Sequence, residues 1–105
     1  MDFNNILKQA QSLKADFEKK QQEFAKLEFE ATSGGGLVKA VLNGKGKVLS
    51  LNLDPTLLDD KDINMTQDLI IAAINNAKDQ VDEGSKDLMS GAASGLNIPG
   101  LDNLL

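Results

Sequence analysis

Three lysines lie in a stretch of the chain that contains no acidic residue. Residues 31–53 hold Lys39, Lys45 and Lys47 and neither Asp nor Glu, although the whole chain carries a net charge of −5. A local cluster of positive charge within an acidic chain is suited to contacts with phosphate groups. Solvated lysines that keep strand edges from aggregating would give the same pattern. The residue types alone leave both interpretations open.

Four more lysines, Lys8, Lys14, Lys19 and Lys20, lie near the N-terminus, in residues 3–28. All eleven positive charges of the chain are lysines, because the sequence contains neither Arg nor His. A lysine ammonium is a point charge that suits a phosphate contact, whereas reading a base edge favours the planar fork of arginine. The composition therefore indicates contacts that position a phosphate backbone and read little sequence.

No known catalytic pattern accompanies these lysines. Gly34–Gly36 precedes Lys39, but the Gly-Lys-Ser/Thr ending of a phosphate loop does not occur. Asp60–Asn64 resembles the start of a calcium loop, yet Met65 and Ile71 occupy the positions that require Gly and Glu. The chain also lacks Cys and His, which excludes thiolate chemistry and the usual general base. We expect no enzyme activity, no metal site and no cofactor.

The first 28 residues predict a long amphipathic helix from about residue 3 to residue 28. Apolar residues recur at heptad spacing over nearly four heptads, and Lys20 interrupts the series. Such a stripe packs either against the core of its own chain or against another chain. The residues predicted for this core or dimer contact are Phe3, Ile6, Ala10, Leu13, Phe17 and Phe24.

The middle of the chain predicts a short strand and a β-hairpin. Residues 28–32 form the short strand, and Ser33–Gly36 is a glycine-rich turn. The segments 37–42 and 47–53 alternate in polarity on either side of Asn43-Gly44, which is a strong signal for a tight turn. Each hairpin strand thus has one apolar face.

A second helix is predicted for residues 60–89, because acidic residues at its start suit the positive end of a helix dipole. Its predicted buried stripe is Leu69, Ile70, Ala73, Ile74, Ala77, Val81 and Leu88. Residues 90–105 are rich in Gly, Ala and Ser and predict a flexible C-terminal tail. The chain thus divides into a domain of residues 1–89 and a tail of residues 90–105.

These elements predict an α+β domain of order α-β-β-β-α, with a small antiparallel sheet and two long flanking helices. A helix of 26 residues is about 39 Å long, whereas a strand of seven residues spans about 23 Å. The helices therefore extend beyond the sheet and carry their apolar stripes with them. Because large exposed apolar stripes are rare in monomers, we expect a homodimer.

The order and spacing of several segments resemble the YbaB/EbfC family of bacterial nucleoid-associated proteins. The similarity covers about residues 3–89 and does not depend on a single motif. The segments that carry it are Ser33–Lys39, Asn43-Gly44, Leu51–Leu58, Asp59–Asp62 and Asp68–Ala77, together with the Gln-, Lys- and Glu-rich first helix.

This resemblance implies a homodimer with paired sheets and protruding helices that binds double-stranded DNA with little sequence preference. It also implies a non-enzymatic role in nucleoid organisation or gene regulation, in the cytoplasm and nucleoid. No apolar stretch approaches the ~20 residues that span a membrane, so no membrane partner is expected. The lysines expected to contact DNA are Lys39, Lys45, Lys47, Lys8, Lys14, Lys19 and Lys20.

The acidity of the chain supports a second hypothesis, in which the protein binds other proteins and not DNA. The last helix carries Asp79, Asp82, Glu83 and Asp87, whereas DNA-binding proteins usually show a strongly basic surface. A dimeric adaptor that binds other proteins and has little DNA affinity would have this composition. A salt-dependent mobility shift of duplex DNA distinguishes the two hypotheses.

Overall fold

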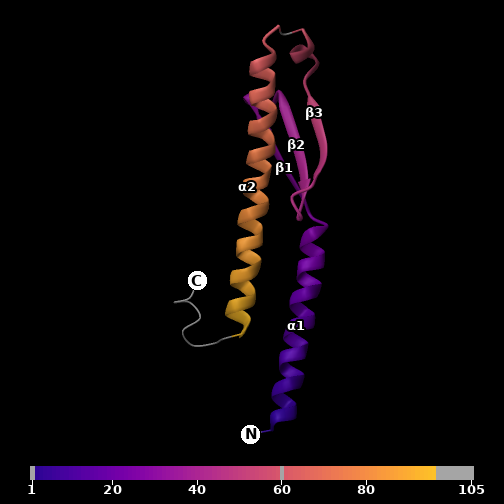
Figure 1. Cartoon of the computed structure of the whole chain (residues 1–105), viewed down its shortest axis with the longest axis vertical. Coiled ribbons are helices and arrows are strands. Elements are labelled where there is room, and N and C mark those ends of the chain that lie inside the picture. Colours follow the sequence, from indigo (N-terminus) through magenta and orange to yellow (C-terminus); the bar gives the residue numbers. More distant parts are fainter. Residues whose placement is uncertain (1, 60, 97–105) are drawn as a thin grey trace.

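A three-stranded antiparallel sheet lies at the centre of the molecule, with one helix across its face and the other beyond its end (Figure 1). This computed structural model describes residues 2–59 and 61–96, and the described elements follow the predicted α-β-β-β-α order. The α+β fold class is therefore confirmed. The elements are α1 (Phe3–Ala25), β1 (Glu28–Ser33), the short 3-10 helix η1 (Gly34–Gly36), β2 (Val38–Asn43), β3 (Val48–Leu53), the 3-10 helix η2 (Pro55–Leu58) and α2 (Ile63–Leu96).

The core lies between α2 and the inner face of β1 and β2. Val38, Ala40 and Leu42 of the central strand are buried, and the residues between them are only partly buried. This alternation is the period-2 pattern that the sequence predicts. Ala73 and Ala77 of α2 are fully buried against it, and their small side chains let the helix approach the sheet closely.

The β2–β3 hairpin turn depends on Asn43 as the sequence predicts. Its side-chain oxygen accepts hydrogen bonds from the backbone N–H groups of Lys45 (2.9 Å) and Lys47 (3.0 Å). Its backbone oxygen accepts a third from Gly46 (2.9 Å), whose φ of 83° favours glycine. The turn therefore holds both lysines in fixed backbone positions.

Helix α1 projects away from the sheet and does not flank it (Figure 1). It ends at Ala25, three residues before the predicted end, because the chain must turn at Lys26 and Leu27 to enter β1 at Glu28. Phe24 is the residue of the predicted stripe that packs against the core, with its ring 5.4 Å from that of Phe29. Phe17 is half-buried, and the other predicted stripe residues, Phe3, Ile6, Ala10 and Leu13, are exposed.

Helix α2 begins and ends later than the sequence predicts. Its first turn is capped by Asp62, whose side chain accepts a hydrogen bond from the backbone N–H of Met65 (3.0 Å). The helix continues through Ser90 and Gly91 to Leu96, so the predicted end at residue 89 was wrong by seven residues. Ser and Gly within a long helix lower its stability only modestly, so the helix can continue through them. The remainder of the predicted tail, residues 97–105, lies outside the described residues.

Replacing Gly44 with Ala is expected to destabilise the fold by about 2 kcal/mol or more, because the added Cβ has no room. That atom would lie 1.9 Å from the backbone oxygen of Phe24, and backbone atoms cannot move aside as a side chain can. The matched control is Gly91→Ala, which adds a Cβ in open space on α2 and should stabilise by about 0.5–1 kcal/mol. Urea denaturation measures the free energy of unfolding of both variants. A Gly44→Ala variant as stable as the unaltered chain would contradict the close approach of Gly44 to Phe24.

Candidate nucleic-acid interface

Lys39 lies on the outer face of the sheet, opposite the face that α2 covers. Its ammonium forms an ion pair with Glu30 of the neighbouring strand β1. Antiparallel pairing of β1 with β2 brings Glu28 and Glu30 beside a strand whose own sequence contains no acid. The segment that is purely basic in the sequence is therefore mixed in charge once the sheet forms.

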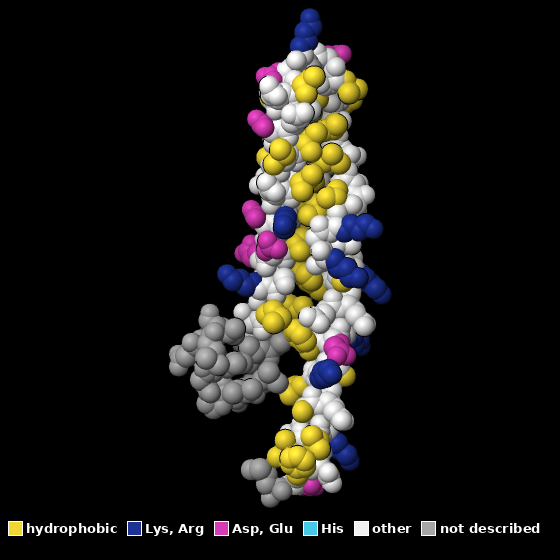
Figure 2. Space-filling model, in the orientation of Figure 1, with side chains coloured by type: hydrophobic (Ala, Val, Ile, Leu, Met, Phe, Trp, Pro, Cys, Tyr) yellow, Lys and Arg dark blue, Asp and Glu magenta, His cyan; other side chains and the backbone are white. Residues whose placement is uncertain are grey.

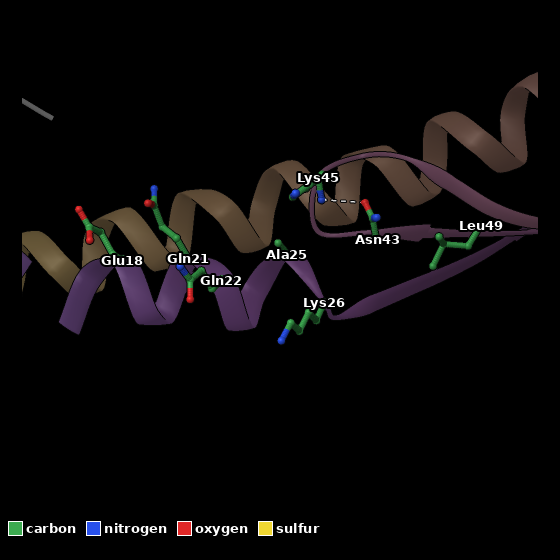
Figure 3. Close-up of a pocket in the computed structure, with 8 residues that line it drawn as sticks. All are labelled: Glu18, Gln21, Gln22, Ala25, Lys26, Asn43, Lys45 and Leu49. Atoms are coloured by element: carbon green, nitrogen blue, oxygen red, sulfur yellow. Dashed lines mark hydrogen bonds between the residues drawn. The ribbon is translucent and has the colours of Figure 1, made fainter. Parts of the chain in front are cut away.

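Lys45 and Lys47 are exposed at the β2–β3 turn, and no acidic residue lies in the turn itself. This turn lies against the last turn of α1, because the backbone N–H of Gly44 donates a hydrogen bond to the oxygen of Ala25 (3.2 Å). The contact brings Lys26, which is also exposed, to the same end of the sheet. Lysines from two separate segments of the chain thus lie at the junction of α1 with the hairpin, and Figure 3 shows the Lys26 side chain pointing away from Lys45.

A notch of about 730 Å³ opens at this junction (Figure 3). Helix α1 contributes Glu18, Gln21 and Gln22 to its lining, Lys26 directly after the helix is a further lining residue, and the turn contributes Asn43 and Lys45. Figure 3 shows Glu18 and Gln21 pointing to the same side of α1 as Lys45. We name this the junction notch. Its polar lining consists of amides, two ammonium groups and one carboxylate.

The lysines predicted from the sequence to contact DNA did not include Lys26. The heptad pattern placed this residue inside a helix that was expected to continue to residue 28. In the structure it is the C-cap of α1, directly before the chain enters the sheet. The earlier helix end could not be inferred from the heptad pattern, because Leu27 continues that pattern.

The predicted lysines of α1 are all exposed along the projecting helix. Lys8, Lys14, Lys19 and Lys20 extend over about 18 Å of helix, at 1.5 Å per residue. They form a spaced series rather than a compact patch. The four acids of α2 named above are also exposed, which gives the second helix an acidic surface.

Within the described residues, no group of His, Cys, Asp or Glu side chains could hold a metal ion, and no helix is long and apolar enough to cross a membrane. Asp54 has a clear structural role at the end of β3. The backbone N–H and the hydroxyl of Thr56 donate hydrogen bonds to its carboxylate, and they hold the pKa of Asp54 below its usual range. These contacts turn the chain into η2.

Strand β3 exposes its apolar side chains. In the strand register, Leu53 lies opposite Val38 and Leu51 lies opposite Ala40, so both leucines share the face that α2 covers elsewhere. Helix α2 packs against β1 and β2 and leaves every residue of β3 exposed. Figure 2 shows hydrophobic side chains forming a band along the length of the visible face. We name Val48, Leu51 and Leu53 the β3 apolar strip.

Comparisons with known proteins agree with this architecture. A sequence model of the YbaB/EbfC DNA-binding family matches residues 1–96. A nucleoid-associated protein of Clostridium novyi is 43% identical over 96% of this chain and 89% of its own length, and one of Rickettsia akari is 38% identical over 94% and 92%. A crystal structure of an uncharacterised Helicobacter pylori protein superposes with a TM-score of 0.72 at 28% identity, over 87% of this chain and 96% of the other. The chain therefore belongs to the YbaB/EbfC DNA-binding family.

Proposed function

We propose that this chain is a non-enzymatic homodimer that binds double-stranded DNA with little sequence preference. Such a protein acts in the nucleoid of the bacterial cytoplasm, in nucleoid organisation or gene regulation. The observation that carries the proposal is the hairpin turn, which holds the exposed Lys45 and Lys47 close together with no acid in the turn, in a chain of a DNA-binding family. Grouped lysines supply the local positive potential that an acidic chain needs in order to approach DNA.

The absence of arginine supports a binding mode directed at the DNA backbone. Lysine contacts to phosphate fix the position of a protein on the duplex but carry no sequence information. The exposed Gln and Asn side chains could contact base edges only if α1 entered a groove. The lysine side chains therefore favour a contact that tolerates any sequence.

The proposed dimer rests on the β3 apolar strip. A strand at the edge of a sheet presents unpaired backbone groups, and protective features such as lysine or proline are absent from Val48–Leu53. Leu51 and Leu53 add an uncovered apolar surface beside that edge. A second copy presents the same surface, so an isologous contact covers both strips at once.

A mobility shift of duplex DNA tests the proposed function directly. If four to six phosphates are neutralised, log affinity falls with log salt at a slope of about −4 to −5. Random and genomic duplexes should compete about equally for the protein, because backbone contacts do not discriminate between them. Fluorescence anisotropy of a labelled duplex at several salt concentrations measures the slope.

The outcome that would overturn DNA binding is the absence of any complex at low salt, where backbone contacts are strongest. The acidic surface of α2 and the exposed apolar residues of α1 would then favour the protein-binding adaptor. A large preference for one sequence would instead contradict binding through the backbone alone.

A further inference from the structure

The N-terminal part of α1 extends beyond the end of α2 (Figure 1). The two helices approach each other where Phe24 lies beside Gly84, and from that level both run away from the sheet. At 1.5 Å per residue, α2 continues for about 18 Å to Leu96, whereas α1 continues for about 31 Å back to Phe3. About 13 Å of α1 therefore has no other helix of the described residues beside it.

This projecting end of α1 carries an exposed apolar surface. Phe3 is 70% exposed, Ile6 and Leu7 are each 45% exposed, and Ala10 is also exposed. We name these four residues the α1 end strip. Phe3 and Ala10 precede Phe24 by whole heptads, so the strip continues the side of α1 that faces α2 at Phe24.

Helix α2 does not cover this side of α1 closely even before it ends. A Cβ added to Gly84 would lie 2.9 Å from the ring of Phe24. A Cβ added to Gly91, one heptad later on the same side of α2, would meet nothing within 4 Å. The two helices therefore separate between these levels, and the cover for the α1 end strip must come from another segment or another chain.

The nine residues that follow α2 in the sequence, residues 97–105, start at the end of α2 that lies beside α1. Fully extended, nine residues span about 30 Å, which is more than the length of α1 that α2 leaves uncovered. Solvated linkers are poor in large aliphatic side chains. This segment instead contains four of them, namely Ile98, Leu101, Leu104 and Leu105.

Charge favours a contact between this segment and α1. Residues 3–14 contain Lys8 and Lys14 and no acid, whereas residues 97–105 contain Asp102 and no lysine. Lys14 follows Ala10 by four residues and therefore lies on the same side of α1 as the α1 end strip. A second copy of α1 would bring the same positive charge to this surface, which disfavours a pairing of two such ends.

We propose that residues 97–105 fold back onto the α1 end strip of the same chain and cover it with Ile98, Leu101 and Leu104. The docked segment joins the outer ends of the two helices, which approach each other at Phe24. The proposal goes beyond the proposed function and depends neither on DNA binding nor on the dimer.

Hydrogen exchange of the full chain tests this docking. The double variant Leu101→Ser, Leu104→Ser should speed the exchange of the amides of residues 7–13 about tenfold or more, because the apolar cover of α1 is lost. Exchange of residues 73–81, in the buried part of α2, should not change. The matched control is Asn97→Ser, Asn103→Ser, which alters polar side chains of the same segment and should leave both regions unchanged.

A spin label shows which copy of α1 the segment contacts. The chain has no cysteine, so Asn103→Cys provides a single attachment site. With the spin label and the isotope label on one chain, diluted about tenfold with unlabelled chain, the amide signals of residues 3–10 should broaden strongly. They should not broaden when the two labels are on different chains. The added substitutions Phe3→Ser, Ile6→Ser should reduce the broadening, because they remove the apolar contact.

Unchanged exchange of residues 7–13 in the Leu101→Ser, Leu104→Ser variant would overturn the docking and leave the α1 end strip to a second copy or another protein. Broadening only between different chains would overturn it too, since the segment would then cover the partner's helix. Equal broadening with and without Phe3→Ser, Ile6→Ser would show that the tether to α2 alone brings the label close. If exchange also speeds up in residues 73–81, the label decides: broadening within one chain that Phe3→Ser, Ile6→Ser reduces supports the docking, and its absence contradicts it.

Discussion

Replacing Leu51 with Asp is expected to convert the proposed dimer into monomers. Leu51 lies opposite the fully buried Ala40 and is 37% exposed in the single chain, so a charge there is tolerable in a monomer. Covered by a second copy, the same carboxylate loses its water and costs about 3 kcal/mol or more, a rise in the dimer dissociation constant of about 100-fold. Sedimentation velocity at micromolar concentration measures the change.

The matched control is Asn52→Asp, which adds the same charge one residue later on the outer, polar face of β3. The Asn52→Asp variant should remain dimeric, because residue 52 lies on the opposite face of β3 from the β3 apolar strip. Circular dichroism and urea denaturation establish that both variants fold. A dimer in the Leu51→Asp variant, or a monomer for the unaltered chain, would contradict this interface.

The stripe of α1 offers a second surface on which the dimer could depend. Leu13 is 41% exposed and Phe17 is half-buried, so neither is fully covered by the rest of the chain. The variant Leu13→Asp therefore separates the two possibilities. Dissociation by Leu13→Asp but not by Leu51→Asp would assign the contact to α1, in agreement with the heptad pattern.

The centre of the fold could be predicted from local patterns. The alternation around Val38, Ala40 and Leu42 identifies a strand with one buried face, and Asn43-Gly44 identifies the turn that follows. The stripe of Ala73, Ala77 and Val81 identifies the helix face that covers it. In each case the signal lies within a few residues, and the same residues make the contact.

The arrangement of charge could not be predicted in this way. Lys39 was grouped with Lys45 because they share a segment without acids, yet the sheet pairs Lys39 with Glu30 and sets Lys45 beside α1. Both changes are contacts between elements distant in the sequence. Lys26 was missed for a related reason, because its position depends on where α1 stops. Periodicity locates elements, but the electrostatic surface depends on how they meet.

The two lysines of the turn should therefore matter far more for DNA binding than Lys39. The double variant Lys45→Gln, Lys47→Gln removes four positive charges from the dimer and keeps the turn polar. Because the salt slope decreases by about 1 for each phosphate that is no longer neutralised, the slope should fall by about 3 to 4. The affinity at 0.1 M salt should fall about 100-fold or more, which anisotropy with a labelled duplex measures.

Lys39→Gln is the internal comparison. The ammonium of Lys39 is already paired with Glu30, so a contact with phosphate requires that ion pair to break first. Its removal should change the affinity less than about threefold, since exposed ion pairs contribute only about 0–1 kcal/mol. The backbone oxygen and side chain of Asn43 hold the turn in all of these variants, so the fold should be retained. If Lys39→Gln weakens binding as much as the double variant does, then DNA contacts the outer face of the sheet. If neither variant weakens binding, the lysines of α1 carry the contact, and the hairpin serves only to hold the two helices.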